Sequence, residues 1–333
     1  MRKIISILIL LATLLTSAAG CSQTEPYSEG EGELKIVAST FVPFDIAREI
    51  TGGRASVSVL QTNGGDLHDY SPTTASLKAI SDADILICIG GASDSLWVEN
   101  AIKASENKRL TVIRLTELAD GELAELEGHT HTPACEENHG GHHSEHDHHH
   151  SVDDGHGHTA DEHIWTSLKN TAKAVSEIAK ICAEKDTENA DFYTDNAAKY
   201  LTKLNALDKE YTEAFEGSEK RTLVFADRFP FIYLVHDYKA CYYAAFNGCG
   251  SEISASFETA VRLTEATKDN SLKYILVTEN SDTKLADSIC DATGSKILAL
   301  DSMQSVSLSE IKDGKTYLKS MKSNLEILKK ALS

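Results

Sequence analysis

The feature that most constrains the fold is an alternation, found twice along the chain, of short runs rich in β-branched residues with segments of helical spacing. In the first block the strand-like runs are 34–40, 55–62, 84–90 and 110–115, and the helix-like segments are 44–50, 73–80 and 97–104. In the second block the strand-like runs are 221–227, 240–246, 273–280 and 296–302, with a helix after each of the first three and a last helix over 315–332. This alternation is typical of a parallel sheet covered by helices.

The two blocks are separated by a long stretch of helical periodicity over 189–215. At a rise of 1.5 Å per residue such a helix is about 40 Å long, which is longer than the core of a small domain requires. We therefore predict an α/β protein of two lobes, 34–185 and 218–333, each with a mainly parallel sheet covered by helices. A rigid connecting helix within 186–217 joins them. A ligand site is expected in the cleft between the lobes, at the C-terminal ends of the strands.

The histidines are distributed very unevenly. Of 14 histidines, eleven lie in an acidic segment without apolar periodicity, 128–160, which is predicted to be a disordered insertion. Neutral imidazoles bind Zn²⁺ well and the interleaved carboxylates attract cations, so we expect this insertion to collect metal ions. A solvated tract without a metal role is the alternative. The eleven residues are His129, His131, His139, His142, His143, His146, His148, His149, His150, His156 and His158.

The first residues have the pattern of an export signal. Arg2 and Lys3 precede an apolar run that is too short to span a bilayer, and no other stretch approaches 18 apolar residues. The residues before Cys21 resemble a bacterial lipobox, which predicts a signal peptide over 1–21 and a lipid anchor on Cys21. Ordinary cleavage at an A-x-A-like site is the alternative. Residues 22–33, rich in Gly, Ser and Glu, are predicted to be a flexible tether.

Composition narrows the class of partner. The net charge of −19 argues against nucleic acid, because phosphate binding needs a positive surface. Cys88 and Cys182 lie in apolar runs and are expected to be buried free thiols. Cys241 and Cys249 could pair in an exported protein, although sequence cannot establish the pairing.

Residues of the types that bind metals occur where strands are expected to end. His68 lies in a Gly-rich loop, His163 begins a helix, and Asp227, Glu279 and Asp301 follow strands of the second block. Histidine nitrogen with carboxylate oxygen suits a divalent ion held by about four ligands. Each signal alone is weak, because acids at strand ends are commonly helix caps.

Together these features resemble the zinc- and manganese-binding lipoproteins of bacterial ABC importers, a solute-binding family. The resemblance covers nearly the whole chain, from about Leu34 to Leu332. It rests on the lipobox, HDYSPT around His68, the acidic His-rich insertion, D-x-H-I-W around His163, the long connecting helix and the second α/β lobe.

The resemblance implies a set of metal ligands. The first two carry over to His68, where Leu67 replaces the usual proline, and to His163. The third is a histidine in the family, and its position is occupied here by Ala226. A methyl group cannot bind metal, so either Asp227 substitutes or the site has one protein ligand fewer.

The fourth implied ligand is Asp301, with Glu279 as the reserve candidate. Two histidines with two aspartates are poorer in nitrogen than a three-histidine zinc site, which favours Mn²⁺. The His-rich insertion favours Zn²⁺, since Mn²⁺ is the weakest binder in the Irving–Williams order. We expect zinc, with manganese as the alternative. His236 is expected to face solvent or the surface of its lobe.

The implied function is a receptor that is lipid-anchored at the outer face of the cell membrane or in the periplasm, binds zinc with high affinity and delivers it to an ABC permease. It is expected to be a monomer and not an enzyme. A secreted metallohydrolase is disfavoured, because the sequence lacks a motif such as H-E-x-x-H. An adhesin on the same fold, or a lipoprotein that has lost tight metal binding, stays open as an alternative.

Overall fold

The computed structural model describes residues 26–119, 161–246 and 255–333. The predicted signal peptide, the lipidation site Cys21, the His-rich insertion with its eleven histidines and Cys249 all lie outside these ranges.

The N-terminal half is built on a five-stranded sheet with the strand order β1-β3-β2-β4-β5. β1 runs antiparallel to β3, and the other neighbouring pairs are parallel. β4, with the sequence Ile-Leu-Ile-Cys, is buried throughout, as a strand covered by helices on both faces should be. The elements are β1 (Tyr27–Glu29), β2 (Lys35–Ala38), α2 (Phe41–Thr51), β3 (Ser56–Val59), the 3₁₀ turn η1 (Leu67–Asp69), α3 (Thr74–Ser81), β4 (Ile85–Cys88), α4 (Ser95–Ser105), β5 (Thr111–Arg114) and the 3₁₀ turn η2 (Leu115–Leu118).

The C-terminal half contains a second sheet, four-stranded and wholly parallel, with the order β7-β6-β8-β9. The predicted strands of both blocks are therefore confirmed, and so is the α/β fold with two lobes. The elements are β6 (Thr222–Phe225), α7 (Ile232–Asp237), β7 (Cys241–Ala244), α8 (Phe257–Asp269), β8 (Tyr274–Thr278), α9 (Lys284–Thr293), β9 (Lys296–Leu300), α10 (Leu308–Lys312) and α11 (Tyr317–Ala331).

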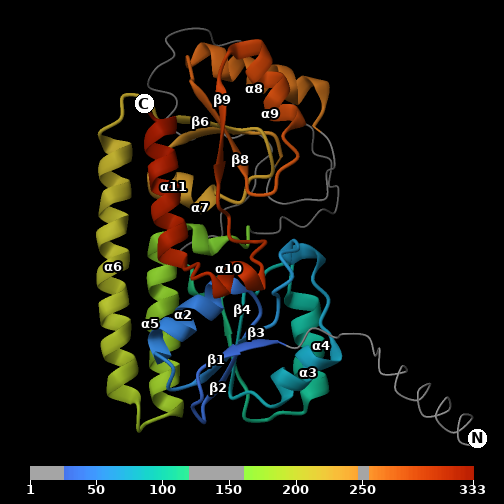
Figure 1. The fold of residues 1–333 in the computed structure, drawn as a ribbon, viewed down its shortest axis with the longest axis vertical. Coiled ribbons are helices and arrows are strands. Elements are labelled where there is room, and N and C mark those ends of the chain that lie inside the picture. Colours follow the sequence, from blue (N-terminus) through green and yellow to red (C-terminus); the bar gives the residue numbers. More distant parts are fainter. Residues whose placement is uncertain (1–25, 120–160, 247–254) are drawn as a thin grey trace, which may run out of the picture.

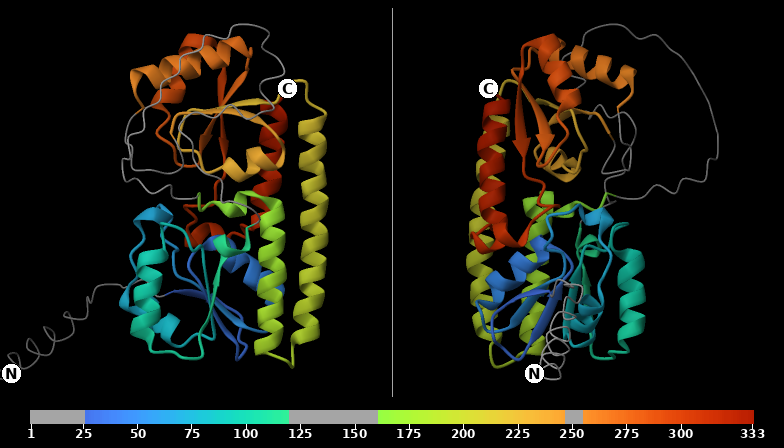
Figure 2. Two further views of the ribbon diagram at one scale, coloured as in Figure 1. Left: turned by 180° about the vertical axis from the view of Figure 1, so that it is seen from behind. Right: turned by 45° about the vertical axis from the view of Figure 1, so that its right-hand side comes forward.

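A long helix runs along both halves. After the 3₁₀ turn η4 (Ile164–Thr166) and α5 (Leu168–Lys185), the chain forms α6 (Ala190–Glu216), of 27 residues, which spans both sheets in Figures 1 and 2. It packs on α2 and α5 in the N-terminal half and on α11 in the C-terminal half. Its buried face follows the predicted stripe: Tyr193, Ala197, Tyr200, Leu204, Leu207, Tyr211 and Phe215.

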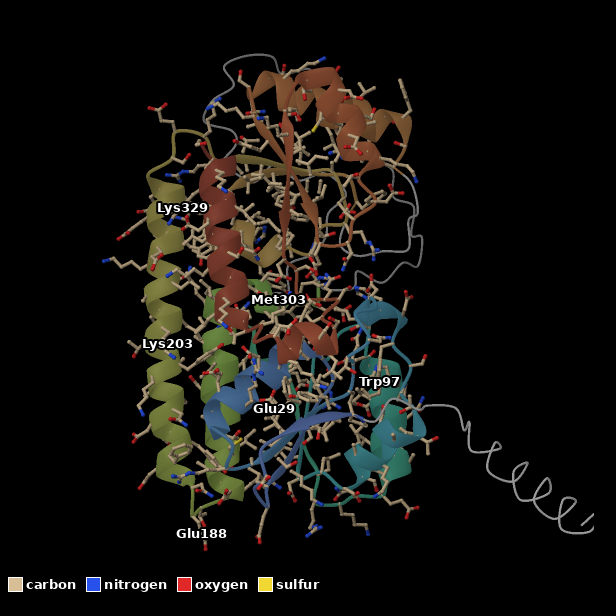
Figure 3. All side chains as sticks on the ribbon, viewed as in Figure 1. Glu29, Trp97, Glu188, Lys203, Met303 and Lys329 are labelled. Atoms are coloured by element: carbon tan, nitrogen blue, oxygen red, sulfur yellow. The ribbon has the colours of Figure 1, made fainter. Side chains whose placement is uncertain are left out.

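The two halves share one hydrophobic core. A single cluster of buried side chains includes Ile36 of the first sheet, Tyr200 of α6 and Leu276 of the second sheet. Met303, labelled in Figure 3 where the halves meet, is buried in the same cluster. Relative movement of the halves would have to break apolar packing, which argues against a wide hinge opening.

Hydrogen bonds from the start of α11 reinforce this junction. The backbone N–H of Tyr317 donates to Asp45 Oδ2 of α2 at 2.7 Å. The Tyr317 hydroxyl donates to the carbonyl of Trp165 at 2.7 Å and accepts from Thr171 Oγ1 at 2.9 Å. All four residues are buried.

One sequence prediction is wrong near the N-terminus. Within the segment 22–33, predicted to be a flexible tether, Tyr27–Glu29 form β1 and pair with Val57, Ser58 and Val59 of β3. Its polar composition concealed the strand, because β1 lies at the edge of the sheet and its side chains are only partly buried.

The cysteines agree with the expectation for free thiols. Cys88 and Cys182 are unpaired and buried, and burial raises the pKa of both thiols. Cys241 is disulfide-bonded. The partner suggested by the sequence, Cys249, lies outside the described ranges. Among the described helices, none combines the length and apolar character that crossing a bilayer requires.

The buried Tyr317 hydroxyl provides a test of the junction. We expect Tyr317→Phe to lower the free energy of unfolding by about 1–3 kcal/mol, because it leaves the buried Trp165 carbonyl without this donor. Urea unfolding measures the change. Tyr274→Phe, at a partly exposed tyrosine of β8, is the control and should change the value by less than about 0.5 kcal/mol. Equal losses in both variants would contradict the bridging role of Tyr317.

Candidate metal centre

A large cavity lies between the two halves, at the C-terminal ends of strands from the second sheet. Its volume is about 1140 Å³, and His68 contributes to its wall from the N-terminal half. The C-terminal half contributes Ala226 and Asp227, which follow β6, and Glu279, which follows β8. Ligands commonly bind at this end of parallel sheets, because the strands end together there.

His68 is presented by a short turn. After β3 the chain forms η1, and Asp66 begins this turn by accepting a hydrogen bond from the His68 backbone N–H at 3.0 Å. The helix that follows, α3, starts with a capping box between Thr73 and Ser76, so the loop is fixed at both ends. The His68 side chain is about a quarter exposed, which leaves it accessible from the cavity.

His163 lies in the segment just before α5, where the sequence predicted the start of a helix. The α-helix itself begins later, at Leu168, after the 3₁₀ turn η4. Asp161 Oδ1 accepts a hydrogen bond from the His163 backbone N–H at 2.8 Å and lies 2.9 Å from its Nδ1. A carboxylate at Nδ1 fixes the proton there and leaves Nε2 as the nitrogen that is available to a metal ion.

The structure brings the two predicted histidines together. Their ring centroids are 5.7 Å apart, with the rings steeply inclined to each other. His163 also contacts the Trp165 ring edge to face, at 5.2 Å between centroids. Two imidazoles contributed by loops almost one hundred residues apart thus face a common space.

Glu162 completes a group that sequence reasoning missed. Its Oε1 lies 3.1 Å from His68 Nδ1, and ligand atoms of His68, Glu162 and His163 all lie within 4.8 Å of one another. Among the described residues this is the one such group of three. The signal that the sequence offers for it is its place directly before His163.

The Glu162 carboxylate is held ionised. Its Oε2 accepts hydrogen bonds from the Ser93 backbone N–H at 3.0 Å and from the Ser93 hydroxyl at 2.7 Å. Burial alone would raise the pKa of Glu162, but the hydrogen bonds from His68 and Ser93 outweigh it and hold the pKa below its ordinary value. A buried carboxylate that stays charged favours a cation beside it.

Gly91 makes room for this carboxylate. A Cβ atom at Gly91 would lie 2.1 Å from Glu162 Oε2 and 2.3 Å from its Cβ. The loop after β4 can therefore wrap around Glu162 only with glycine at this position.

Two of the other predicted carboxylate ligands accept hydrogen bonds from neighbouring residues. Asp227 and Glu279 line the same cavity as His68, but each accepts hydrogen bonds within its own half, from Thr278 and Ser302 respectively. Burial raises the pKa of Glu279.

Asp301, predicted as the fourth ligand, is not among the described residues that line this cavity. Its Oδ2 lies 2.8 Å from Lys315 Nζ and accepts from the Ser320 hydroxyl at 2.7 Å. The aspartate is thus paired with a lysine near the start of α11. His236, at the end of α7, is exposed, as expected.

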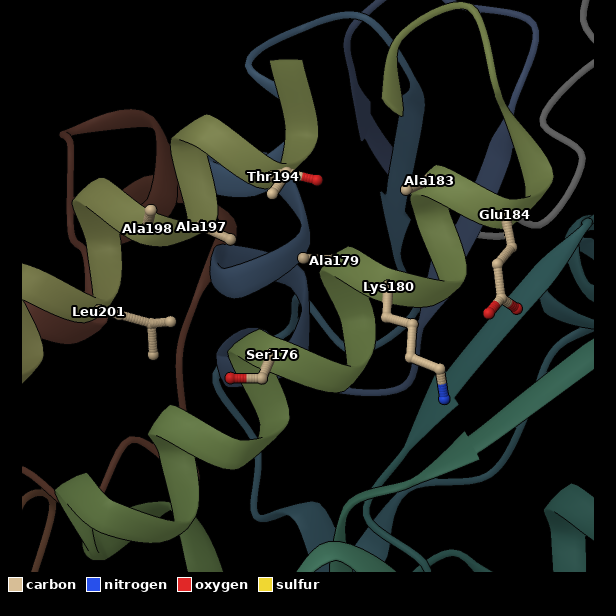
Figure 4. A pocket seen from close by; sticks show the side chains of 9 residues that line it. All are labelled: Ser176, Ala179, Lys180, Ala183, Glu184, Thr194, Ala197, Ala198 and Leu201. Carbon is tan, nitrogen blue, oxygen red and sulfur yellow. The ribbon is translucent and has the colours of Figure 1, made fainter. Parts of the chain in front are cut away.

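An ion pair links the halves at the rim of this cavity. Asp66, which supports His68, also pairs with Arg228 of the C-terminal half through its second oxygen. A separate hollow of about 550 Å³ lies between α5 and α6, lined mainly by short side chains such as Ala179, Ala183 and Ala197 (Figure 4). The described residues that line it include no histidine or cysteine, so it is unsuited to zinc.

Comparisons with known proteins find similarity to zinc-binding and zinc-uptake proteins. The model of the family described as "Zinc-uptake complex component A periplasmic" (ZnuA) matches residues 36–331. The zinc-binding protein AdcA of Streptococcus pyogenes is 28% identical over 303 residues, which are 90% of this chain and 56% of AdcA. The high-affinity zinc uptake system protein ZnuA of Bacillus subtilis is 27% identical over 320 residues, 96% of this chain and 94% of that protein.

Solved structures share the fold. The crystal structure of Zn(II)-bound AdcA from Streptococcus pneumoniae superposes with a TM-score of 0.67 at 24% identity, over 90% of this chain and 58% of that one. The chain thus spans little more than half the length of the AdcA proteins that it matches.

The contact between Gly91 and Glu162 can be tested by metal affinity. We expect Gly91→Ala to raise the Kd for zinc about 10- to 100-fold, because its Cβ displaces the carboxylate that supports the site. Ser93→Ala should have a smaller effect, since the backbone N–H of residue 93 still donates. Competition with a fluorescent zinc chelator measures both.

Ser95→Ala is the matched control, because Ser95 is an exposed residue at the start of the next helix. It should leave the Kd unchanged. A Gly91→Ala protein that binds zinc as tightly as the parent would separate Glu162 from the metal site.

Proposed function

The chain belongs to the ZnuA family of periplasmic zinc-uptake components, and we propose that it is an exported, lipid-anchored receptor that binds zinc and delivers it to a membrane ABC permease. The lipid anchor is proposed from the lipobox that ends at Cys21. In this role the ion is cargo, and the protein performs no chemical reaction on it.

The observation that carries the proposal is the convergence of His68, Glu162 and His163 in one group. Two imidazoles with one carboxylate form a ligand set suited to Zn²⁺. Ligand atoms of the three residues all lie within 4.8 Å of one another, close enough for one ion to reach all of them. We propose these three residues as the metal ligands, with manganese as the weaker alternative ion.

Contacts with neighbouring polar residues hold the proposed ligands in place. Asp161 fixes the ring of His163, Ser93 fixes Glu162, and Asp66 fixes the turn that carries His68. Such outer contacts orient ligands before the ion arrives, which raises affinity. We propose that the His-rich insertion collects ions for this site.

Substitution of the histidines tests the site directly. We expect His68→Ala and His163→Ala each to raise the Kd for zinc by more than about 100-fold, because loss of a ligand should exceed the 10- to 100-fold cost of losing an outer contact. Isothermal titration with a competing chelator measures the affinity.

Two controls separate the site from other histidines. His236→Ala removes an exposed imidazole of the same chain and should leave the Kd unchanged. Deletion of 129–158 should also leave the tight site intact while slowing zinc uptake at scarce metal. Parent-like affinity in both His68→Ala and His163→Ala would contradict the assignment.

Glu162→Gln tests the third ligand. The substitution keeps an oxygen that can accept from His68 but removes the negative charge, so we expect the Kd for zinc to rise about 10- to 100-fold. Asp227→Asn, on the same cavity, is the comparison and should change the Kd less than about 3-fold, because Asp227 is engaged by Thr278. The reverse order of effects would move the third ligand to Asp227.

A further inference from the structure

We propose that Arg228 and Tyr233 of the C-terminal half are positioning residues of the zinc site. Each contacts the aspartate that supports one of the two histidines, so that together they set how the two imidazoles are placed relative to each other. The proposal rests on the zinc site proposed above and adds the residues of the second half on which its affinity depends.

The two histidines are presented in the same way, each two residues after an aspartate. In the first turn, Asp66 Oδ1 accepts a hydrogen bond from the His68 backbone N–H at 3.0 Å. In the second, Asp161 Oδ1 accepts from the His163 backbone N–H at 2.8 Å. An aspartate side chain that bonds to the backbone two residues further on forms a local turn. The position of each imidazole therefore depends on how its aspartate is held.

The first aspartate is held by an arginine of the other half. Arg228 pairs with Asp66 Oδ2, the oxygen that does not bind the His68 N–H. The Asp66 side chain is only 18% exposed. A carboxylate engaged through both oxygens cannot rotate without losing a contact, so Arg228 fixes the orientation in which Asp66 supports the turn.

The second aspartate is held by a tyrosine. The Tyr233 hydroxyl donates to the backbone carbonyl of Asp161 at 2.7 Å, and Asp161 Oδ1 lies 2.9 Å from His163 Nδ1. All three residues are buried. Loss of the hydroxyl would leave a buried carbonyl without this donor. The Asp161 peptide, and with it the carboxylate at His163, would then lose a contact that fixes its orientation.

Both positioning residues belong to one firmly held segment, 226–233, which leads from β6 into α7. Asp227 Oδ2 accepts a hydrogen bond from the Thr278 backbone N–H at 3.1 Å. The Phe229 ring stacks on Tyr242 of β7, with 4.5 Å between the centroids. The segment is therefore fixed to the second sheet, and through it both histidine turns are tied to that sheet.

The contribution of the C-terminal half to the site is indirect. The group of His68, Glu162 and His163 contains no described residue of this half. Ala226, at the start of the segment, carries a methyl group that cannot bind metal. What the segment supplies is the placement of the ligands, and such outer contacts raise affinity because they orient the ligands before the ion binds.

The zinc affinity of the full chain tests both residues. We expect Arg228→Gln and Tyr233→Phe each to raise the Kd for zinc about 3- to 10-fold, because they act one contact further from the ion than the residues whose loss costs about 10- to 100-fold. Competition with a zinc chelator measures the Kd. Arg221→Gln, directly before β6, and Tyr274→Phe, in β8, are the matched controls and should leave it unchanged.

The absorption of bound Co²⁺ separates positioning from a general loss of stability. The visible bands of Co²⁺ report the geometry of its ligands, whereas the urea midpoint of the metal-free chain reports stability. We expect Arg228→Gln and Tyr233→Phe to shift the bands in chains that are fully folded before metal is added. A lowered midpoint with parent-like bands and Kd would show a structural role alone and overturn the inference.

Double variants test whether each residue acts through its aspartate. In a chain that carries Asp66→Ala, Arg228→Gln should raise the Kd little further, because the link to the histidine is already lost. Tyr233→Phe should likewise add little to Asp161→Ala. Fully additive effects in both pairs would contradict the proposal.

The failure of this inference can be distinguished from the failure of the zinc site. Parent-like affinity in Arg228→Gln and Tyr233→Phe, with affinity lost in His68→Ala and His163→Ala, would overturn the positioning role and leave the receptor role standing. Metal binding that survives the loss of both histidines would overturn the proposed function itself.

Discussion

The proposed metal site depends on one short segment, residues 161–166, that belongs to the N-terminal half in sequence and is hydrogen-bonded to both halves in space. The Tyr233 hydroxyl donates to the Asp161 carbonyl at 2.7 Å, and Trp165 Nε1 donates to the Ser302 carbonyl at 2.9 Å. Tyr317 holds the Trp165 carbonyl from α11. Because Glu162 and His163 lie between these contacts, a movement between the halves would change the positions of two of the proposed ligands relative to His68.

This coupling explains how the site could release its ion without a large domain motion. The shared core and the continuous helix α6 resist wide opening, so a permease would act through small tilts or loop shifts. A tilt need only pull the loop at Ser302 or the ion pair between Asp66 and Arg228 to disturb the ligands. The long helix therefore limits the range of motion, while the contacts of residues 161–166 would turn a small shift into a displacement of the proposed ligands.

The two sheets and the connecting helix could be predicted from the sequence, because they depend on the local pattern of apolar residues. Buried parallel strands leave apolar β-branched runs, and α6 leaves a stripe of apolar residues at helical spacing, so sheets and connecting helix were predictable. The strand at Tyr27–Glu29 was missed because an edge strand of polar residues leaves no such pattern. The motifs around His68 and His163 point to these two residues, which the structure brings close together.

The rest of the site depends on contacts between distant residues. Glu162 acquires its role from Gly91 and Ser93, some seventy positions earlier, and no feature of its own neighbourhood in the sequence reports that contact. Asp301 looked suitable because it ends a strand, but Lys315 folds back to neutralise it. Whether a strand-end acid binds metal or a lysine is decided by tertiary packing, which a pattern of residue types does not encode.

The most direct test of a centre held by His68, Glu162 and His163 is a crystal structure of the full chain loaded with zinc, with the ion located by its anomalous scattering. We predict one tightly bound ion within about 2.0–2.2 Å of a nitrogen of each histidine and an oxygen of Glu162. We also predict that Asp301 stays paired with Lys315. An ion bound between Asp227 and Asp301, away from Glu162, would contradict the proposed centre.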